Sequence, residues 1–542
     1  MKILDSAAGP LEASILVEGL RARPGWFVGL SLICYVIVWS ITLQIVESAP
    51  APELAVALAL GREWQSGYAG AAPLPLWIAE SVFRFTHSFF LLRLLAVVCV
   101  ALAGWLVFLF ARRIIGARHA AIASLLMIGV YPVAWPAETW SAQVLQMPLI
   151  AAAIYLWWRG VGERNPYCLA ALGIALAATL YTGPQGIVLF VVFVFATLVS
   201  PRARAAFTRF EMQIGGGFFA FFFILLSLPR LFWLTRNGWR NLLPGIESGI
   251  PESDLLRVKE LLLPLAAGHA GLLALVCLAA VYAVRAKQNA PVFVREPESM
   301  LARRSTFALA LFPLPLALLW LWWRNTQTVP AAASSLLLLS GVAVIMFAGQ
   351  RVRIRRQQAI AGVMAGFLFF PAAVQIAAAY TSSWLWQDKR SVNWPAEPAA
   401  RTFTEIFRTR TGEPLAYIIG ERIPASQIAA LSRERPRVFI DADISQNPWV
   451  DIEEFKRRGG VVFWEVRGVD VDPPAWLRAW LPPFTPEAPL RLPWTRGGGD
   501  PVRLGWAIVL PAAQMPKPVE QPKTEEQPKT EPQPQGPASA PQ

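Results

Sequence analysis

The sequence predicts a helical protein with several membrane spans, followed by a smaller α/β domain. Of its 542 residues, 55% are hydrophobic and only 16% are charged, which is too few charges to cover a water-exposed surface. The mean hydropathy of +0.44 also places the chain in the membrane class. Arg and Lys recur in short clusters between the apolar runs, and this pattern gives the runs an orientation.

The apolar runs predict about eleven spans when some runs shorter than a full bilayer crossing are accepted. A mixed, polar segment at residues 1–25 precedes them, and residues 26–383 form the predicted transmembrane domain, with a first outer loop at 47–88. The spans are expected near 26–46, 89–110, 120–134, 145–158, 167–180, 186–199, 215–234, 261–284, 307–323, 331–348 and 360–380.

The basic clusters fall in every second connection, as expected when they mark the cytoplasmic face. This alternation predicts a cytoplasmic N-terminus and, with an odd number of spans, an outer location for everything after residue 380. It also accounts for most of the net charge of +13, so we expect no nucleic-acid partner. The clusters are Arg21/Arg23, Arg112/Arg113/Arg118, Arg159/Arg164, Arg202/Arg204/Arg209, Arg285/Lys287/Arg303/Arg304 and Arg351/Arg353/Arg355/Arg356.

Residues 384–511 have the composition of a soluble domain. Strand-like runs such as LAYIIG, RVFIDAD, VVFWEVRG and RLGWAIVL alternate with the helical segments SQIAALSRE and IEEFKRR, a pattern typical of a small α/β domain. The tail at 512–542 is rich in Pro, Gln, Lys and Glu and too poor in apolar residues to fold, which predicts disorder.

The first outer loop carries the leading candidate for chemistry. Glu53 opens an apolar segment that fits a short helix lying on the membrane surface, and a Gly67-Tyr68 turn and a Pro-Leu-Pro-Leu-Trp run follow. A carboxylate held there could act as a general base toward a hydroxyl group. The alternative is that Glu47, Glu53 and Glu63 are ordinary solvated residues.

Three segments together resemble the bacterial family 39 glycosyltransferases, which are relatives of protein O-mannosyltransferases and of the lipid A aminoarabinose transferase in the C-type (GT-C) superfamily. They are GREWQSGYAGAAPLPLW after Glu53, LFARRIIGARHAAIASLLMIGVYPVAW, and the stretch from PLAYIIGERIPASQ to KRRGGVVFW. The resemblance runs from about residue 26 to about residue 511 and rests on the order and topology of loose motifs. It implies a GT-C-like bundle in a bacterial inner membrane with a periplasmic C-terminal domain.

The resemblance implies transfer of a sugar from a polyprenyl phosphate to an acceptor on the periplasmic side, with inversion of the anomeric centre. Alignment on Gly67-Tyr68 and Trp77 puts Glu53 at the position of the family's catalytic carboxylate. Leu54, Val56 and Ala71 depart from the acidic and Gln residues common nearby, and the turn YTGPQG, with Gly183, replaces a segment in which many relatives carry a lysine.

The other candidate site residues lie in the outer loops and in the second span. Glu138 stands between two tryptophans in WPAETWSAQ, where it is a candidate for an acceptor or metal contact, although an interfacial Glu is equally expected there. Arg236 and Arg240 lie in a strongly basic outer loop and suit a donor phosphate. Arg93, inside a span, is costly in lipid and is a further phosphate candidate.

No resident cofactor is predicted beyond a possible divalent cation. The four cysteines fall in apolar spans without a CxxC pair, and the three histidines lack zinc-site spacing. Asp441, Asp443 and Asp451 do not match a calcium loop and are interpreted as turn residues. Walker, GxGxxG and GxSxG motifs are not found in the sequence, which argues against the enzymes that use them.

The sequence therefore predicts a membrane glycosyltransferase with Glu53 as base. Its expected partners are a polyprenyl-phosphate-linked sugar, a lipid, glycan or protein acceptor, and membrane lipid. Two alternatives remain open. One is a non-catalytic relative that binds a lipid-linked sugar or scaffolds an envelope complex, favoured by the missing acidic and lysine residues. The other is a transporter, which is disfavoured because no inverted halves are evident.

Overall fold

The computed structural model describes residues 15–130, 133, 140–239, 266–280, 291–311, 315, 337–354, 356–385, 393–466, 471–478, 481–496 and 500–514. Within these ranges, five helices are long and apolar enough to cross a membrane. They are α2 (Pro24–Val46), α5 (Phe89–Ile115), α8 (Ala142–Trp157) with its π-helical extension η2 (Trp158–Gly162), α12 (Phe210–Asn237) and α19 (Gln357–Leu385).

Shorter apolar helices complete the described part of the bundle. Most of them coincide with the runs predicted from sequence. The exception is α15, which begins before the span predicted at 307–323. The rest of that predicted span lies largely outside the described ranges, which omit residues 312–314 and 316–336. These helices are α6 (Ala117–Leu126) with η1 (Met127–Gly129), α9 (Pro166–Leu180), α10 (Gln185–Val199), α14 (Ala270–Ala280), α15 (Met300–Leu311) and α18 (Ser340–Phe347).

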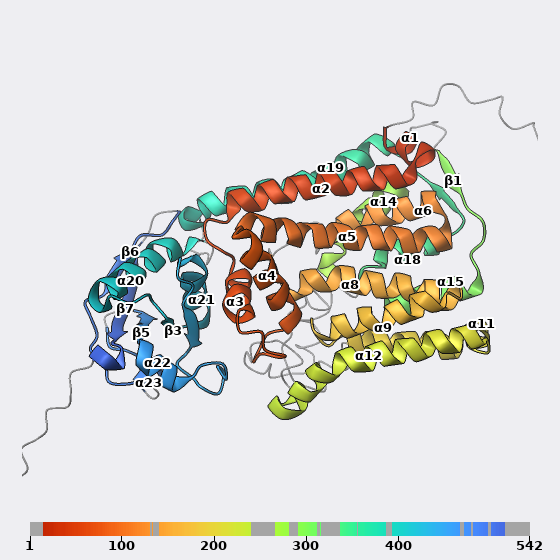
Figure 1. Ribbon diagram of the computed structural model, residues 1–542. Helices are drawn as coiled ribbons and strands as arrows, with labels where there is room; N and C mark the ends of the chain where they lie inside the picture. Colours follow the sequence, from red (N-terminus) through yellow and green to blue (C-terminus); the bar gives the residue numbers. More distant parts are fainter. Residues whose placement is uncertain are drawn as a thin grey trace, which may run out of the picture.

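The long helices lie side by side in one layered bundle. α19 packs on α2, α2 on α5, α5 on α8, α8 on α9 and α9 on α12, as Figure 1 shows from the top of the view downward. Glycines allow the closest approach, because a Cβ on Gly173 of α9 would lie 2.5 Å from the carbonyl oxygen of Phe219 in α12. Small residues at such contacts are typical of helix pairs in membranes.

The outer surface of this bundle is apolar. On α2 the exposed side chains Leu30, Ile33, Ile37 and Ile41 recur every three or four residues, which places them along one face of the helix. α12 exposes a similar series that includes Phe218 and Phe221. A contiguous apolar face of this size suits lipid rather than water, so the chain is a multi-pass membrane protein.

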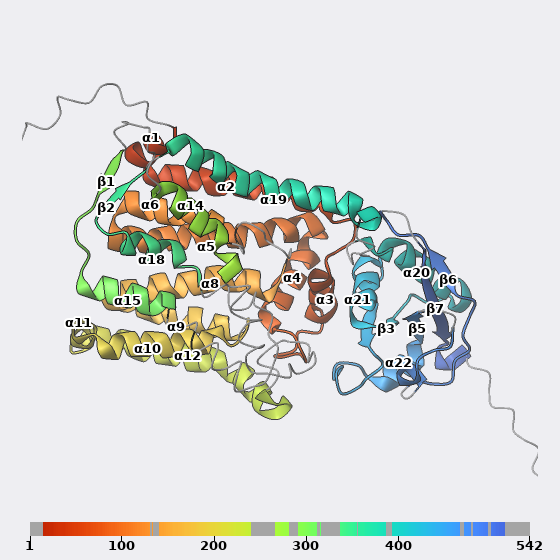
Figure 2. The ribbon, with the colours of Figure 1, turned by 180° about the vertical axis from the view of Figure 1, so that it is seen from behind.

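The basic clusters and the α/β domain occupy opposite ends of the bundle. In Figures 1 and 2, α11 (Pro201–Ala206), α15 and the hairpin of β1 (Val292–Val294) and β2 (Arg351–Arg353) lie at the end farthest from the α/β domain. The short helix α1 (Ile15–Ala22) lies at this basic end, where it buries Leu16, Val17 and Leu20.

The first outer loop folds into two helices, α3 (Pro52–Gly61) and α4 (Pro73–Thr86), each with proline in its first turn, where no backbone N–H is needed. The predicted helix after Glu53 is present, but the expected placement of its apolar face on the membrane surface is wrong. Leu54 and Leu58 are fully buried because α3 packs between α4 and α21 of the α/β domain.

The C-terminal region contains a mixed five-stranded sheet in the order β4-β3-β5-β7-β6. Its strands are β3 (Tyr417–Gly420), β4 (Arg437–Ile440), β5 (Gly460–Glu465), β6 (Leu490–Leu492) and β7 (Val502–Val509). β3 is parallel to β4 and β5, whereas β7 is antiparallel to β5 and β6. The helices are α20 (Ala396–Thr411), α21 (Arg422–Leu431), α22 (Ile452–Arg458) and α23 (Ala475–Arg478).

Candidate functional site

The first outer loop contains four carboxylates, and the structure separates one of them from the other three. Glu47, Glu63 and Glu80 have side chains that are 5%, 6% and 1% exposed, and each is paired with an arginine. Glu53 is exposed in the first turn of α3 and forms no ion pair with any residue that the structure describes. Glu53 is therefore the one of these four carboxylates that is exposed.

Glu47 is held by Arg93, which belongs to α5. The Arg93 Nε donates to Glu47 Oε2 at 2.8 Å, its Nη1 donates to Gln44 Oε1 at 2.7 Å, and its Nη2 donates to the Glu47 carbonyl at 3.4 Å. Both side chains are buried. Three of the arginine's N–H groups thus fix the end of α2 against α5, which satisfies a charge that would be costly in the bilayer.

Glu80 and Glu63 are held from the other side, by the α/β domain. Arg435 contacts Glu80 with both terminal nitrogens, at 3.1 Å and 2.6 Å, a bidentate pair of the strong kind. Arg437 Nε lies 3.4 Å from Glu63 Oε1, and Arg62 donates to the Arg435 carbonyl. The loop and the α/β domain are therefore joined by buried charges as well as by the apolar face of α3.

A cleft of about 230 Å³ opens at this junction. It is lined by Arg62, Tyr417, Arg435, Arg437, Glu454 and Arg458, among others. Arg437 and Arg458 contact Glu454 at 3.0 Å and 3.7 Å, so the guanidinium groups of the cleft are largely matched by carboxylates. This matching makes the cleft a joint between domains rather than a strong anion site.

The Gly67-Tyr68 turn is wedged between α12 and the α/β domain. A Cβ on Gly67 would lie 2.2 Å from the Trp233 ring and 2.5 Å from Arg230 Nη1, so only glycine fits there. Tyr68 meets the Trp449 ring edge-on at 5.9 Å, and its hydroxyl accepts from the Gln65 N–H at 2.8 Å. Burial raises the pKa of Tyr68 to about 12, which keeps this phenol neutral at physiological pH.

The predicted phosphate contacts lie in different surroundings. Arg236, in the last turn of α12, is exposed, with its guanidinium 4.1 Å from the centre of the Phe232 ring, so it remains open to an anion. Arg93 is engaged by Glu47. Arg240 and the predicted acceptor contact Glu138 lie outside the described residues. The structure gives no direct contact among Glu53, Arg93 and Arg236.

The turn at residues 181–185 uses its polar groups internally. Gln146 Nε2 donates to Thr182 Oγ1 at 3.2 Å and to Gln185 Oε1 at 2.6 Å, and all three side chains are buried. Leu74 N–H donates to the Tyr181 carbonyl, which ties this turn to the start of α4. The turn therefore supports the first outer loop.

Sequence reasoning did not find Arg435 and Arg437, which hold the loop from the α/β domain. Glu80 is the sequence feature that could have indicated a buried ion pair, because a lone carboxylate within the apolar run PLPLWIAESVF needs a partner. A group of three potential metal ligands is not found within the described ranges. Asp443 accepts from Ser445 in a turn, and Asp451 accepts from the Glu453 N–H at the start of α22, so both have the structural roles expected of them.

The apolar helices, the two-helix first outer loop and the C-terminal α/β domain form a polytopic membrane protein whose fold is like that of GT-C proteins. A family model for dolichyl-phosphate-mannose-protein mannosyltransferases matches residues 70–233, from just after the Gly67-Tyr68 turn to the outer part of α12. The crystal structure of ArnT from Cupriavidus metallidurans bound to undecaprenyl phosphate matches with a TM-score of 0.56 at 13% identity, over 92% of this chain and 100% of that chain.

The structure of the Archaeoglobus fulgidus oligosaccharyltransferase in complex with zinc and sulfate also matches, with a TM-score of 0.39 and 12% identity, over 80% of this chain and 67% of that chain. None of the curated proteins matches this chain in a sequence comparison. The family model and the ArnT structure confirm the resemblance to GT-C glycosyltransferases and the predicted fold class.

Proposed function

We propose that this protein transfers a sugar from a polyprenyl-phosphate donor to a lipid, glycan or protein acceptor on the outer side of a bacterial inner membrane. The observation that carries the proposal is the separation of Glu53 from the other three carboxylates of its loop. Glu47, Glu63 and Glu80 are buried in ion pairs, whereas Glu53 is exposed. The likeness of the fold to a structure bound to undecaprenyl phosphate supports the donor class.

In the proposed reaction, Glu53 accepts the proton of an acceptor hydroxyl while the hydroxyl oxygen attacks the anomeric carbon. The bond between that carbon and the phosphate oxygen breaks, the configuration inverts, and polyprenyl phosphate leaves with the bonding electrons. A general base of this kind contributes roughly 100-fold to 10,000-fold to a rate. Positive charge near the leaving phosphate stabilises its developing negative charge.

Arg236, in the last turn of α12, and Arg240 are the proposed phosphate contacts, and Glu138 remains a proposed acceptor or metal contact. The exposure of Arg236 supports its assignment. Arg93 is a weaker proposal, because a phosphate would have to compete with Glu47 for the guanidinium. If a divalent cation takes part in the reaction, Glu138 is the residue proposed to hold it, and the cation would supply positive charge for the leaving phosphate.

The proposed orientation puts the N-terminus in the cytoplasm and the α/β domain in the periplasm. It is supported by the position of the basic clusters at the end opposite that domain. Attachment of a reactive cysteine label to an introduced Cys at exposed Glu397, in α20, should occur from outside intact spheroplasts; labelling only after lysis would reverse the orientation.

The activity is tested with the purified protein in lipid nanodiscs. Undecaprenyl-phosphate-linked sugars carrying a radiolabel are supplied with an extract of envelope acceptors, and released undecaprenyl phosphate is measured, because its release does not depend on which acceptor is used. Glu53→Gln should reduce the rate at least about 100-fold. Glu397→Gln, a matched change at another exposed carboxylate, should leave the rate unchanged. Equal rates for Glu53→Gln and the wild type would remove Glu53 from the reaction.

A second candidate, a non-catalytic protein that binds a lipid-linked sugar, is favoured by the internal use of Thr182 and Gln185. In that case these residues support the loop and leave the turn without a free group for the donor phosphate. Saturable binding of the radiolabelled donor without release of undecaprenyl phosphate, for every sugar tested, would decide for this candidate.

A further inference from the structure

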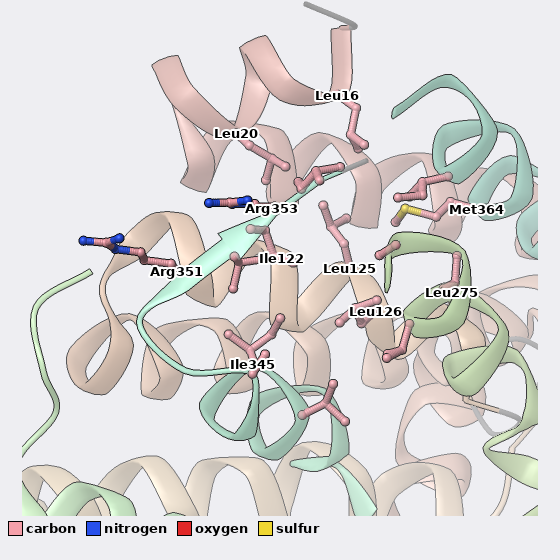
Figure 3. A pocket seen from close by; sticks show the side chains of 17 residues that line it. Leu16, Leu20, Ile122, Leu125, Leu126, Leu275, Ile345, Arg351, Arg353 and Met364 are labelled. Carbon is pink, nitrogen blue, oxygen red and sulfur yellow. The ribbon is translucent and has the colours of Figure 1, made fainter. Parts of the chain in front are cut away.

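A second cavity lies at the basic end of the bundle, far from the first outer loop. It has a volume of about 210 Å³ and is enclosed by α1, α6, α14, α18 and α19, with the strand β2 along one side. Figure 3 shows its lining at close range. The residues that enclose it include Leu20, Ile122, Leu125, Leu275, Ile345 and Met364.

The apolar lining ends at two arginines. Arg351 and Arg353 alternate along β2, so their side chains leave the strand on the same face. Figure 3 shows both guanidinium groups on one side of the cavity, opposite Leu275 and Met364. Both residues are exposed, and neither forms an ion pair with another residue in the described part of the chain.

The surroundings add positive charge rather than neutralise it. Arg21 of α1 lies over the ring of Phe293 in β1, at 6.0 Å, and β1 pairs with β2. The nearby carboxylate Glu298 is already engaged by Arg295. At the mouth of the cavity, Arg351 and Arg353 thus lie beside an apolar interior and outside any ion pair found among the described residues.

We propose that this cavity binds one acyl chain of an anionic phospholipid, whose phosphate lies against Arg351 and Arg353. An apolar cavity of this kind does not retain water, which needs polar partners. A lipid tail gains little by moving from the bilayer into it, because both surroundings are apolar. The headgroup therefore determines which lipid binds. The two guanidinium groups favour a lipid whose phosphate is not neutralised by an amine in the same headgroup.

The position of the site agrees with this occupant. The basic loops that surround it mark the cytoplasmic face in the proposed orientation, where anionic lipids attract Arg and Lys side chains. The amphipathic helix α1 places Leu16 and Leu20 on the cavity, so it forms the wall nearest the membrane surface. The occupied site would brace α1, β2 and α18 at the end of the molecule opposite the proposed reaction.

The test is native mass spectrometry of the full-length protein released from mixed vesicles of phosphatidylglycerol and phosphatidylcholine. The wild type should retain phosphatidylglycerol preferentially. Each arginine near a membrane surface is worth about a fivefold change in lipid affinity, so Arg351→Gln with Arg353→Gln should weaken retention about 30-fold. Arg202→Gln with Arg204→Gln, at the same end but away from the cavity, should retain the lipid as the wild type does.

A second variant distinguishes lipid binding in the cavity from general attraction of anionic lipid to a basic surface. Ala348→Phe fills the cavity and leaves both arginines in place, so it should also lose preferential retention. Inorganic phosphate at matched concentration should not raise the melting temperature, whereas phosphatidylglycerol should. Undiminished retention in the Arg351/Arg353 variant, an equal loss in the Arg202/Arg204 variant, or full retention in Ala348→Phe would each overturn the proposal.

Discussion

Arg435 of the α/β domain contacts Glu80 of α4 through both of its terminal nitrogens, at 2.6 Å and 3.1 Å. The Glu80 side chain is 1% exposed, and Arg84, the other cation near it, lies 3.5 Å away with a side chain that is 55% exposed. The pair therefore connects a buried carboxylate of the transmembrane domain to a domain that follows it by more than three hundred residues.

Replacing Arg435 with Gln should loosen the junction strongly, because it leaves Glu80 buried without its main partner. Breaking a buried pair in this way costs about 3–5 kcal/mol. Hydrogen exchange in α3 and α21 should rise, and the melting temperature should fall. Arg458→Gln, which removes an exposed pair with Glu454, should change neither measurement.

Glu63 should make the junction pH-dependent. Burial raises the pKa of Glu63 above its ordinary value near 4.5, and the charges of Arg437 and Arg62 oppose this rise. The folded protein therefore holds the proton more tightly than the unfolded chain does, so stability falls as pH rises from about 4.5 through the raised pKa. Thermal unfolding measured from pH 5 to pH 7 should show this slope in the wild type.

Glu63→Gln supplies the control for that measurement. The amide cannot titrate, so the melting temperature of this variant should lack the part of the slope that comes from Glu63. An identical slope in both proteins would assign the pH dependence to other groups.

Gly67→Ala should destabilise the first outer loop. The new Cβ would fall within 2.3 Å of two atoms of the Trp233 ring, which is packed between the loop and α12 and is rigid. Overpacking of this kind costs about 1–3 kcal/mol. Gly217→Ala is the matched change, since a Cβ there meets nothing within 4 Å and lies on an exposed helical face. Gly217→Ala should raise the melting temperature slightly, because Ala favours a helix.

A comparison of single and double variants can decide whether Arg93 has a structural role or contacts the donor phosphate. Arg93→Gln alone leaves Glu47 buried and uncompensated, which should cost about 3–5 kcal/mol of stability. Adding Glu47→Gln should restore most of that loss. If the stable double variant also transfers sugar at the wild-type rate, Arg93 is a structural residue; if stability returns without activity, Arg93 contacts the donor phosphate.

The sequence predicted the parts of the fold that depend on local patterns. The apolar runs and the alternation of basic loops depend on composition alone, and the strands LAYIIG and RVFIDAD carry enough apolar and β-branched residues to be recognised. The helix α4 was not predicted, because its start, Pro-Leu-Pro-Leu-Trp, was placed within the first outer loop, although proline is well placed in the first turn of a helix.

The partners within the site could not be predicted, because they join residues far apart in the chain. Nothing local to Glu47 indicates that Arg93 will hold it, and nothing local to Glu63 indicates Arg437. The apolar face of α3 was assigned to the membrane for the same reason. The helix is apolar nearly all round, and this composition does not reveal whether lipid or protein covers it.

The packing of α3 against α21 also has a consequence for how the protein is made. Glu80 and Arg435 are 355 residues apart. At about 5–20 residues per second, the ribosome therefore synthesises Arg435 about 20–70 s after Glu80. During that interval Leu54 and Leu58, which are fully buried in the folded protein, have no α/β domain to cover them. The first outer loop therefore reaches its final packing only after the transmembrane helices that follow it have been made.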